Sequence, residues 1–185
     1  MAKNIAIEEA PLSRFLFSST AMAWFWLLVR VYVGWTWLSA SMEKLKSPAW
    51  IGPDAGGALT GFIKGALAKT AGAHPDVQGW YASFLQNTVL PHAHGWSALI
   101  AYGEMLVGVA LILGALTGIA AAFGLFMNLN FLLSGTVSIN PVLFVLSLGL
   151  VLAWRVAGYY GVDRILLPMA GTPWSPGRLF RGRAA

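Results

Sequence analysis

Three polar side chains stand inside long apolar runs of this sequence, and their chemistry gives the first indication of function. Arg30, Glu104 and Asn128 each lie in a different run. Ionisable groups at membrane depth are costly, so each one marks a candidate binding site or proton path. An arginine beside a glutamate can form an ion pair, and an asparagine adds a hydrogen-bond donor and an acceptor. The elements that carry these residues must therefore be identified next.

The apolar runs have the lengths expected of transmembrane helices. A helix needs about 20 apolar residues to cross about 30 Å of hydrocarbon. Of the whole chain, 57% is hydrophobic and only 10% is charged, whereas a soluble domain carries about 25% charged residues. We predict an all-α fold, an integral membrane four-helix bundle formed by residues 21–168 as a single domain. Its spans are predicted at residues 21–41, 96–116, 119–134 and 141–156.

A connection of about fifty residues separates the first and second predicted spans. Inside this loop, residues 42–95, apolar residues recur at helix-face spacing in 59–67 and again in 80–89. Proline is expected to end the second stretch at Pro91. Both stretches are too short to span a bilayer. We therefore predict amphipathic helices that lie in the interface or cover the bundle.

Charge predicts the orientation of the chain. Four spans place both termini on one side, and basic residues favour the cytoplasmic side. The N-terminal segment 1–20 and the basic tail 169–185, with Arg178, Arg181 and Arg183, are therefore predicted to be cytoplasmic. Arg155 is expected to extend to the inner headgroups. The lysines of loop 42–95 argue the other way, but long loops cross largely regardless of charge. This predicts a multi-pass protein of the cell (inner) membrane.

Depth and helical faces bring the polar groups together. Counted from the outer ends of their spans, Arg30 lies about 18 Å deep and Glu104 about 12 Å deep. Asn128 lies near the depth of Glu104, whereas Asn130 points away from it. Each polar residue shares its helical face with a stripe that contains small residues, which let helices approach closely: Gly34, Trp37 and Ser41 with Arg30; Ser97, Ala101 and Gly108 with Glu104; Gly124, Phe131 and Gly135 with Asn128. We therefore expect Arg30 to pair with Glu104.

This polar cluster has three interpretations. It can lock the helices in register with no ligand, it can bind a small polar or redox-active molecule, or it can form a proton path. Glu104 is the best candidate for a catalytic group, with Arg30, Asn128 and Trp37 as the other site candidates.

Four further candidates lie at the predicted outer surface: Glu43, Lys44, His92 and His94. Histidines two residues apart occupy different faces of a helix, although a loop could converge them on a metal. We do not predict a metal site there and favour capping or headgroup contacts. The sequence has no cysteine, which excludes disulfides and iron–sulfur ligation. No phosphate-binding loop or nucleotide motif is present, so no nucleic-acid partner is expected, and the arginine tail is interpreted as a lipid-contacting topology signal.

Several short motifs resemble the DoxX/DoxD family in their order and spacing. They are 30–34 (RVYVG) with 42–45 (MEKL), 102–108 (YGEMLVG) with 113–117 (LGALT), 127–131 (MNLNF) and 161–166 (GVDRIL). Residues 80–91 look most like the DoxD branch, which includes the small subunit of thiosulfate:quinone oxidoreductase. The resemblance covers about residues 24–168.

The resemblance implies a membrane subunit of a quinone-linked oxidoreductase assembly, with thiosulfate as a candidate donor, working with other membrane subunits in the lipid bilayer. No motif for a bound cofactor is recognisable, and a membrane quinone is the cofactor implied. Glu104 with Arg30 would then bind a quinone oxygen or relay its protons, with Trp35 and Trp37 as an apolar wall. The alternative is a non-catalytic accessory subunit of a larger respiratory or photosynthetic complex. A solute transporter is a third hypothesis, and whether the chain is an enzyme stays open.

Overall fold

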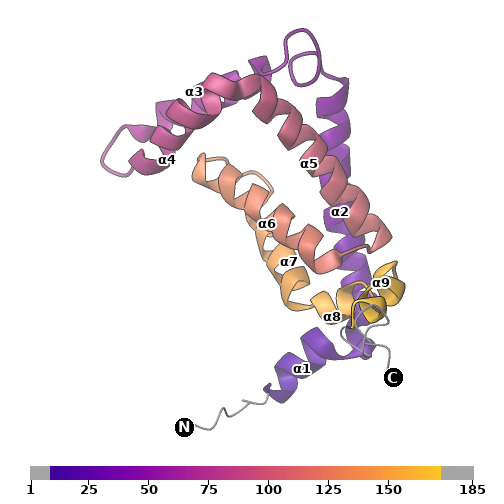
Figure 1. Cartoon of the computed structure of the whole chain (residues 1–185). Coiled ribbons are helices and arrows are strands. Elements are labelled where there is room, and N and C mark those ends of the chain that lie inside the picture. The colour runs from indigo at the N-terminus through magenta and orange to yellow at the C-terminus, as the bar shows by residue number, and fades with distance from the viewer. Residues whose placement is uncertain (1–8, 172–185) are drawn as a thin grey trace, which may run out of the picture.

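The computed structural model describes residues 9–171, and this part of the chain is helical, with no strand. Figure 1 shows long helices that run lengthwise through the molecule and short helices at both of its ends. In chain order they are α1 Pro11–Ser18, α2 Ala23–Lys46, α3 Gly57–Leu67, α4 Gly79–Phe84, α5 Ala93–Leu113, α6 Thr117–Leu133, α7 Asn140–Leu152, α8 Trp154–Ala157 and α9 Asp163–Met169. The helical core of each predicted span is therefore present, with ends that shift by a few residues.

The four long helices form two antiparallel pairs, α2 with α5 and α6 with α7 (Figure 1). Glycine makes the first pair close. A Cβ at Gly108 would lie 2.6 Å from the backbone nitrogen of Leu38, and one at Gly34 would lie 3.0 Å from the Gly108 carbonyl oxygen. The small-residue faces of α2 and α5 therefore do meet, as the sequence predicts, because the absence of side chains lets the backbones touch.

The chain stays helical through Pro91, so the prediction of a helix end there is wrong. A π-helical segment, Leu85–Val89, and a 3₁₀ turn, Leu90–His92, join α4 to α5 without a break. Such turns absorb the missing N–H and the ring clash of a proline by re-spacing the backbone hydrogen bonds. In Figure 1 the axis changes direction between α4 and α5 as a result.

The segment from α3 to Val89 forms a small domain-like layer, which we call the cap (residues 57–89). Its buried core includes Leu59, Ile63 and Tyr81. The Tyr81 hydroxyl donates to the Asn130 carbonyl oxygen at 3.0 Å. The Lys69 ammonium donates to the Gly135 carbonyl oxygen at 2.6 Å. The cap thus covers the C-terminal end of α6, one of the two positions that its amphipathic pattern allows.

The helices nearest the two termini, α1 and α9, lie at the end of the molecule opposite to the cap (Figure 1). There Arg155 bonds Glu9 at 2.9 Å, and it also donates to Ser18. This hydrogen bond to Arg155 lowers the pKa of the Glu9 carboxyl. Arg155 thus connects α8 with the start of the described chain. Its predicted contact with lipid headgroups stays a prediction. The predicted arginine tail lies outside the described residues.

Two helical stretches, Thr20–Lys46 and Gly79–Leu113, are long and apolar enough to cross a membrane. Thr117–Leu133 and Asn140–Leu152 are shorter apolar helices. Large apolar side chains face outward along these helices, among them Leu106, Phe123 and Val145. An apolar surface of this length is unfavourable in water, and it is favourable in contact with the hydrocarbon tails of lipids.

Candidate functional site

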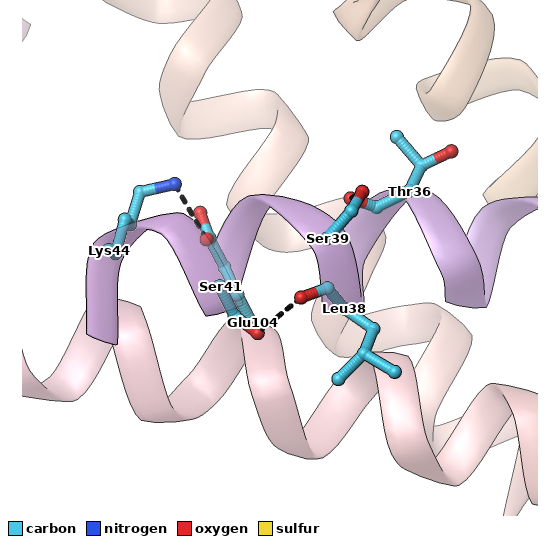
Figure 2. Close-up of polar contacts among 6 residues, drawn as sticks. All are labelled: Thr36, Leu38, Ser39, Ser41, Lys44 and Glu104. Carbon is cyan, nitrogen blue, oxygen red and sulfur yellow. Dashed lines mark hydrogen bonds and ion pairs between the residues drawn. The ribbon is translucent and has the colours of Figure 1, made fainter. Parts of the chain in front are cut away.

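An ion pair between Lys44 and Glu104 occupies the contact between α2 and α5 (Figure 2). The Lys44 ammonium lies 2.7 Å from Glu104 Oε2. The Glu104 side chain is 1% exposed and that of Lys44 is 17% exposed. Lys44 sits in the last turn of α2 and reaches back to Glu104, because helical side chains lean toward the N-terminus of their helix. A buried carboxylate therefore connects to the surface through one lysine.

The predicted pairing of Arg30 with Glu104 is wrong. Arg30 is fully buried toward the opposite end of the same helix pair. Its guanidinium donates to the Leu111 carbonyl oxygen at 2.9 Å and to the Tyr160 carbonyl oxygen at 3.0 Å. Leu111 lies in the last turn of α5, where carbonyls have no partner in the helix and the helix dipole is negative. Arg30 therefore binds the carbonyl end of α5, and Glu104 pairs with Lys44 instead.

Asp163, which was not among the site residues predicted from the sequence, completes the cluster around Arg30. It is fully buried. Its carboxylate accepts from the backbone N–H of Leu116 at 2.6 Å and of Thr117 at 2.8 Å. These are unpaired donors at the start of α6, where a negative charge is favourable. The signal was present, because Asp163 is the one acidic residue that follows Glu104 in the sequence.

Glycine allows this cluster, which we call the inner clamp (Arg30, Gly114, Gly161 and Asp163). Gly114 has φ +68 and ends α5 in the left-handed region. A Cβ there would collide with the Arg30 guanidinium, and one at Gly161 would lie 2.8 Å from Gly114 Cα. The Asp163 N–H also donates to the Gly114 carbonyl oxygen at 2.8 Å. The inner clamp joins α2, α5, α6 and α9 by charges that bind backbone groups.

A buried hydroxyl and an aromatic ring lie close to Lys44. Ser41 stands one turn before Lys44 on the same face of α2, and its hydroxyl donates to the Leu38 carbonyl oxygen at 2.8 Å (Figure 2). The Lys44 ammonium also lies 5.2 Å from the centre of the Trp50 ring. A cation over an aromatic face is stabilised electrostatically. We call Lys44, Glu104, Ser41 and Trp50 the outer pair site.

Trp37 and Asn128, the other predicted site residues, are buried between the helix pairs. Trp37 is 3% exposed and its ring stacks on Phe131 at a centroid distance of 6.4 Å. Asn128 is fully buried on α6. Asn130 faces elsewhere, as predicted, and its side chain accepts from Tyr81 in the cap. Trp35 is exposed, so the structure does not place it with Trp37 as a wall.

The remaining outer candidates do not join the pair. Glu43, His92 and His94 are exposed. His92 Nδ1 lies 3.2 Å from the Thr88 carbonyl oxygen, an arrangement within its own turn. Within residues 9–171, no group of three His, Asp or Glu side chains is placed to hold a metal ion. Of the four outer candidates, Lys44 alone contacts a buried titratable group.

Comparison with known proteins adds one match. The model of the family described as "TQO small subunit DoxD" matches residues 25–172, most of the chain. No curated protein and no solved structure matches the chain.

Proposed function

Because the chain belongs to the DoxD family, we propose that it is the membrane subunit of a quinone-linked oxidoreductase assembly. In this proposal α2, α5, α6 and α7 cross the inner membrane as a four-helix bundle. The end that carries α1 and α9 faces the cytoplasm, and the cap faces outward. The family description names a TQO small subunit, so thiosulfate is the first donor to test. A partner subunit delivers the electrons.

The observation that carries the proposal is the Lys44–Glu104 pair. Reduction of a quinone to a quinol takes up two electrons and two protons, so a protein group must bring protons to the ring oxygens. Glu104 is shielded from solvent, while the partly exposed Lys44 at 2.7 Å connects it with the surface. A carboxyl held next to a lysine can accept and release a proton without exposing the site to bulk water. Lys44 would also donate to a quinone oxygen.

The test replaces Glu104 with glutamine in the intact assembly, isolated with its co-purifying subunits. Glu104→Gln keeps the shape and removes the proton. Loss of a general acid–base group lowers a rate by about 10²–10⁴, so donor-dependent quinone reduction should fall at least about a hundredfold. Glu43→Gln is the matched control, because Glu43 is exposed beside Lys44. Unchanged turnover in Glu104→Gln, with the assembly intact, would show that the pair has no catalytic part.

A second candidate is an accessory subunit that does no chemistry. The observation in its favour is that Lys44, Glu104, Arg30 and Asp163 all find partners inside the chain. In that case Glu104→Gln would reduce the yield of assembled particle, while turnover per particle would stay at the parent value. Counting particles by mass and assaying the same sample separates the two functions.

A further inference from the structure

Buried hydrogen-bonding groups without partners lie in the seam between the two helix pairs. Neither Asn128 Nδ2 nor Asn128 Oδ1 has a hydrogen-bond partner within residues 9–171, and the same holds for Trp37 Nε1. Asn128 is 0% exposed and Trp37 is 3% exposed. Buried polar groups in proteins are nearly always paired, so unpaired ones indicate a bound molecule that satisfies them. Arg30 Nε, Thr117 Oγ1 and Ser147 Oγ are also buried without a partner within residues 9–171. What distinguishes Trp37 and Asn128 is that they come from facing helices, α2 and α6.

The two side chains share one surface of α6. Gly124, Asn128 and Phe131 follow at helical spacing, so they lie on one face. Trp37 covers that face: its Nε1 lies 3.0 Å from the point where a Gly124 Cβ would stand, and its ring stacks on Phe131. Phe62 of the cap meets Phe131 edge to face at 6.0 Å. The unpaired groups therefore have aromatic walls.

The outer pair site lies at the same level. A Cβ at Gly124 would also lie 3.3 Å from Val107 on α5. Glu104 is one turn from Val107 in the direction of the cap, and Asn128 is one turn from Gly124 in the same direction, because α5 and α6 run oppositely. A ring in the seam would thus lie next to Asn128 of α6, and the Lys44–Glu104 pair of α2 and α5 would lie at the same level of the molecule.

We propose that this seam binds the headgroup of a quinone, with Trp37 Nε1 and Asn128 as its hydrogen-bonding groups. The inference rests on the proposed function and names its substrate site. Quinone oxygens only accept hydrogen bonds, so the indole N–H and the Asn128 amide N–H₂ suit them, whereas a quinol hydroxyl can donate to Asn128 Oδ1. Asparagine therefore serves both redox states without changing charge. Binding in this position requires Trp37 and Phe131, whose rings stack on each other in this structure, to separate and receive the quinone ring.

The test titrates a short-chain benzoquinone into the full chain with its co-purifying subunits, reconstituted in lipid nanodiscs, and measures the dissociation constant by calorimetry. Trp37→Phe and Asn128→Leu each replace a hydrogen-bonding side chain by an apolar one: phenylalanine keeps an aromatic ring, and leucine has nearly the size of asparagine. Each should weaken binding about tenfold, the value of one good hydrogen bond. Trp35→Phe is the matched control, because Trp35 is exposed two residues away. It should bind like the parent.

A second measurement needs no substitution. A photoactivatable azidoquinone should label the peptide that contains Trp37 or residues 124–131 of the unmodified chain. Labelling elsewhere, or parent-like affinity in both variants, would overturn the seam site while leaving a quinone-linked function standing. A parent particle that neither binds the benzoquinone nor becomes labelled would overturn both proposals.

Discussion

Within residues 9–171, the inner clamp and the outer pair site both bury charge at the contact of α2 with α5, and they do so differently. In the inner clamp, Arg30 and Asp163 bind backbone carbonyls and N–H groups of helix ends. In the outer pair site, two side chains bind each other, and one of them, Lys44, is partly exposed. Charges on backbone groups fix where helices begin and end. A side-chain pair with access to the surface can exchange a proton, which is why we propose the outer pair site, and not the inner clamp, as the place of chemistry.

Gly114→Ala, in the inner clamp, is expected to change the free energy of unfolding most. The new Cβ would collide with the Arg30 guanidinium, and φ +68 is unfavourable for alanine. We expect a loss of at least about 3 kcal/mol in unfolding free energy, since overpacking and backbone strain add. Thermal unfolding of the purified chain in detergent measures it. A Cβ at Gly103, within α5, would lie 3.8 Å from Met127 Sδ, an ordinary van der Waals contact, so Gly103→Ala should not destabilise the fold. Equal stability of the two variants would show that the inner clamp does not stabilise the fold.

Asp163→Ala should have the next largest effect. It leaves the backbone N–H groups of Leu116 and Thr117 without their acceptor, at a cost of about 1–3 kcal/mol. Thermal unfolding in the same detergent gives the value. Asp54→Ala, at an exposed position in the loop before α3, is the control and should unfold like the parent. If Asp163→Ala matches this control, the carboxylate does not support the start of α6.

The contact between cap and α6 should respond less. Tyr81→Phe removes the hydroxyl that donates to the Asn130 carbonyl oxygen, which costs about 0.5–1.5 kcal/mol. Hydrogen exchange should therefore become faster in the cap, while α2 and α5 stay protected. Tyr102→Phe, on an exposed side chain of α5, supplies the comparison. Equal exchange in both variants would mean that the cap is held by other contacts.

The smallest effect belongs to the exposed Glu9–Arg155 pair. Arg155 lowers the pKa of Glu9 in the folded protein, so the pair stabilises above the unfolded pKa of the carboxyl. This stabilisation is lost as pH falls through the lowered pKa. Arg155→Gln should therefore match the parent in acid and differ from it only slightly at neutral pH, because exposed pairs contribute little. A large difference in acid would contradict this assignment.

The positions of the long helices could be predicted from the sequence, because apolar length and small-residue faces determine them. Glu104 and Asn128 could also be found, since each interrupts an apolar run. The partner of Glu104 could not, because the depth estimate ended the first span at Ser41, whereas α2 continues to Lys46. That extra turn brings Lys44 within reach of Glu104. Arg30 was misassigned because charge pairing was considered and the carbonyls at the end of α5 were not.

Asp163 and the helix through Pro91 were missed for a different reason. The role of Asp163 depends on a contact between segments far apart in the chain, that of its carboxylate with Thr117. Local pattern favours a turn at a proline. The π-helical and 3₁₀ segments before α5 let the helix pass through Pro91 instead, by re-spacing the backbone hydrogen bonds.

The most direct test of the account compares Glu104→Gln with Asp163→Asn in one assembled preparation. Quinone reduction per particle and thermal stability are measured on the same samples. We expect Glu104→Gln to lose turnover and keep most of its stability, whereas Asp163→Asn should lose stability and keep turnover per folded particle. Parallel loss of both properties in both variants would contradict the division between a catalytic outer site and a structural inner clamp.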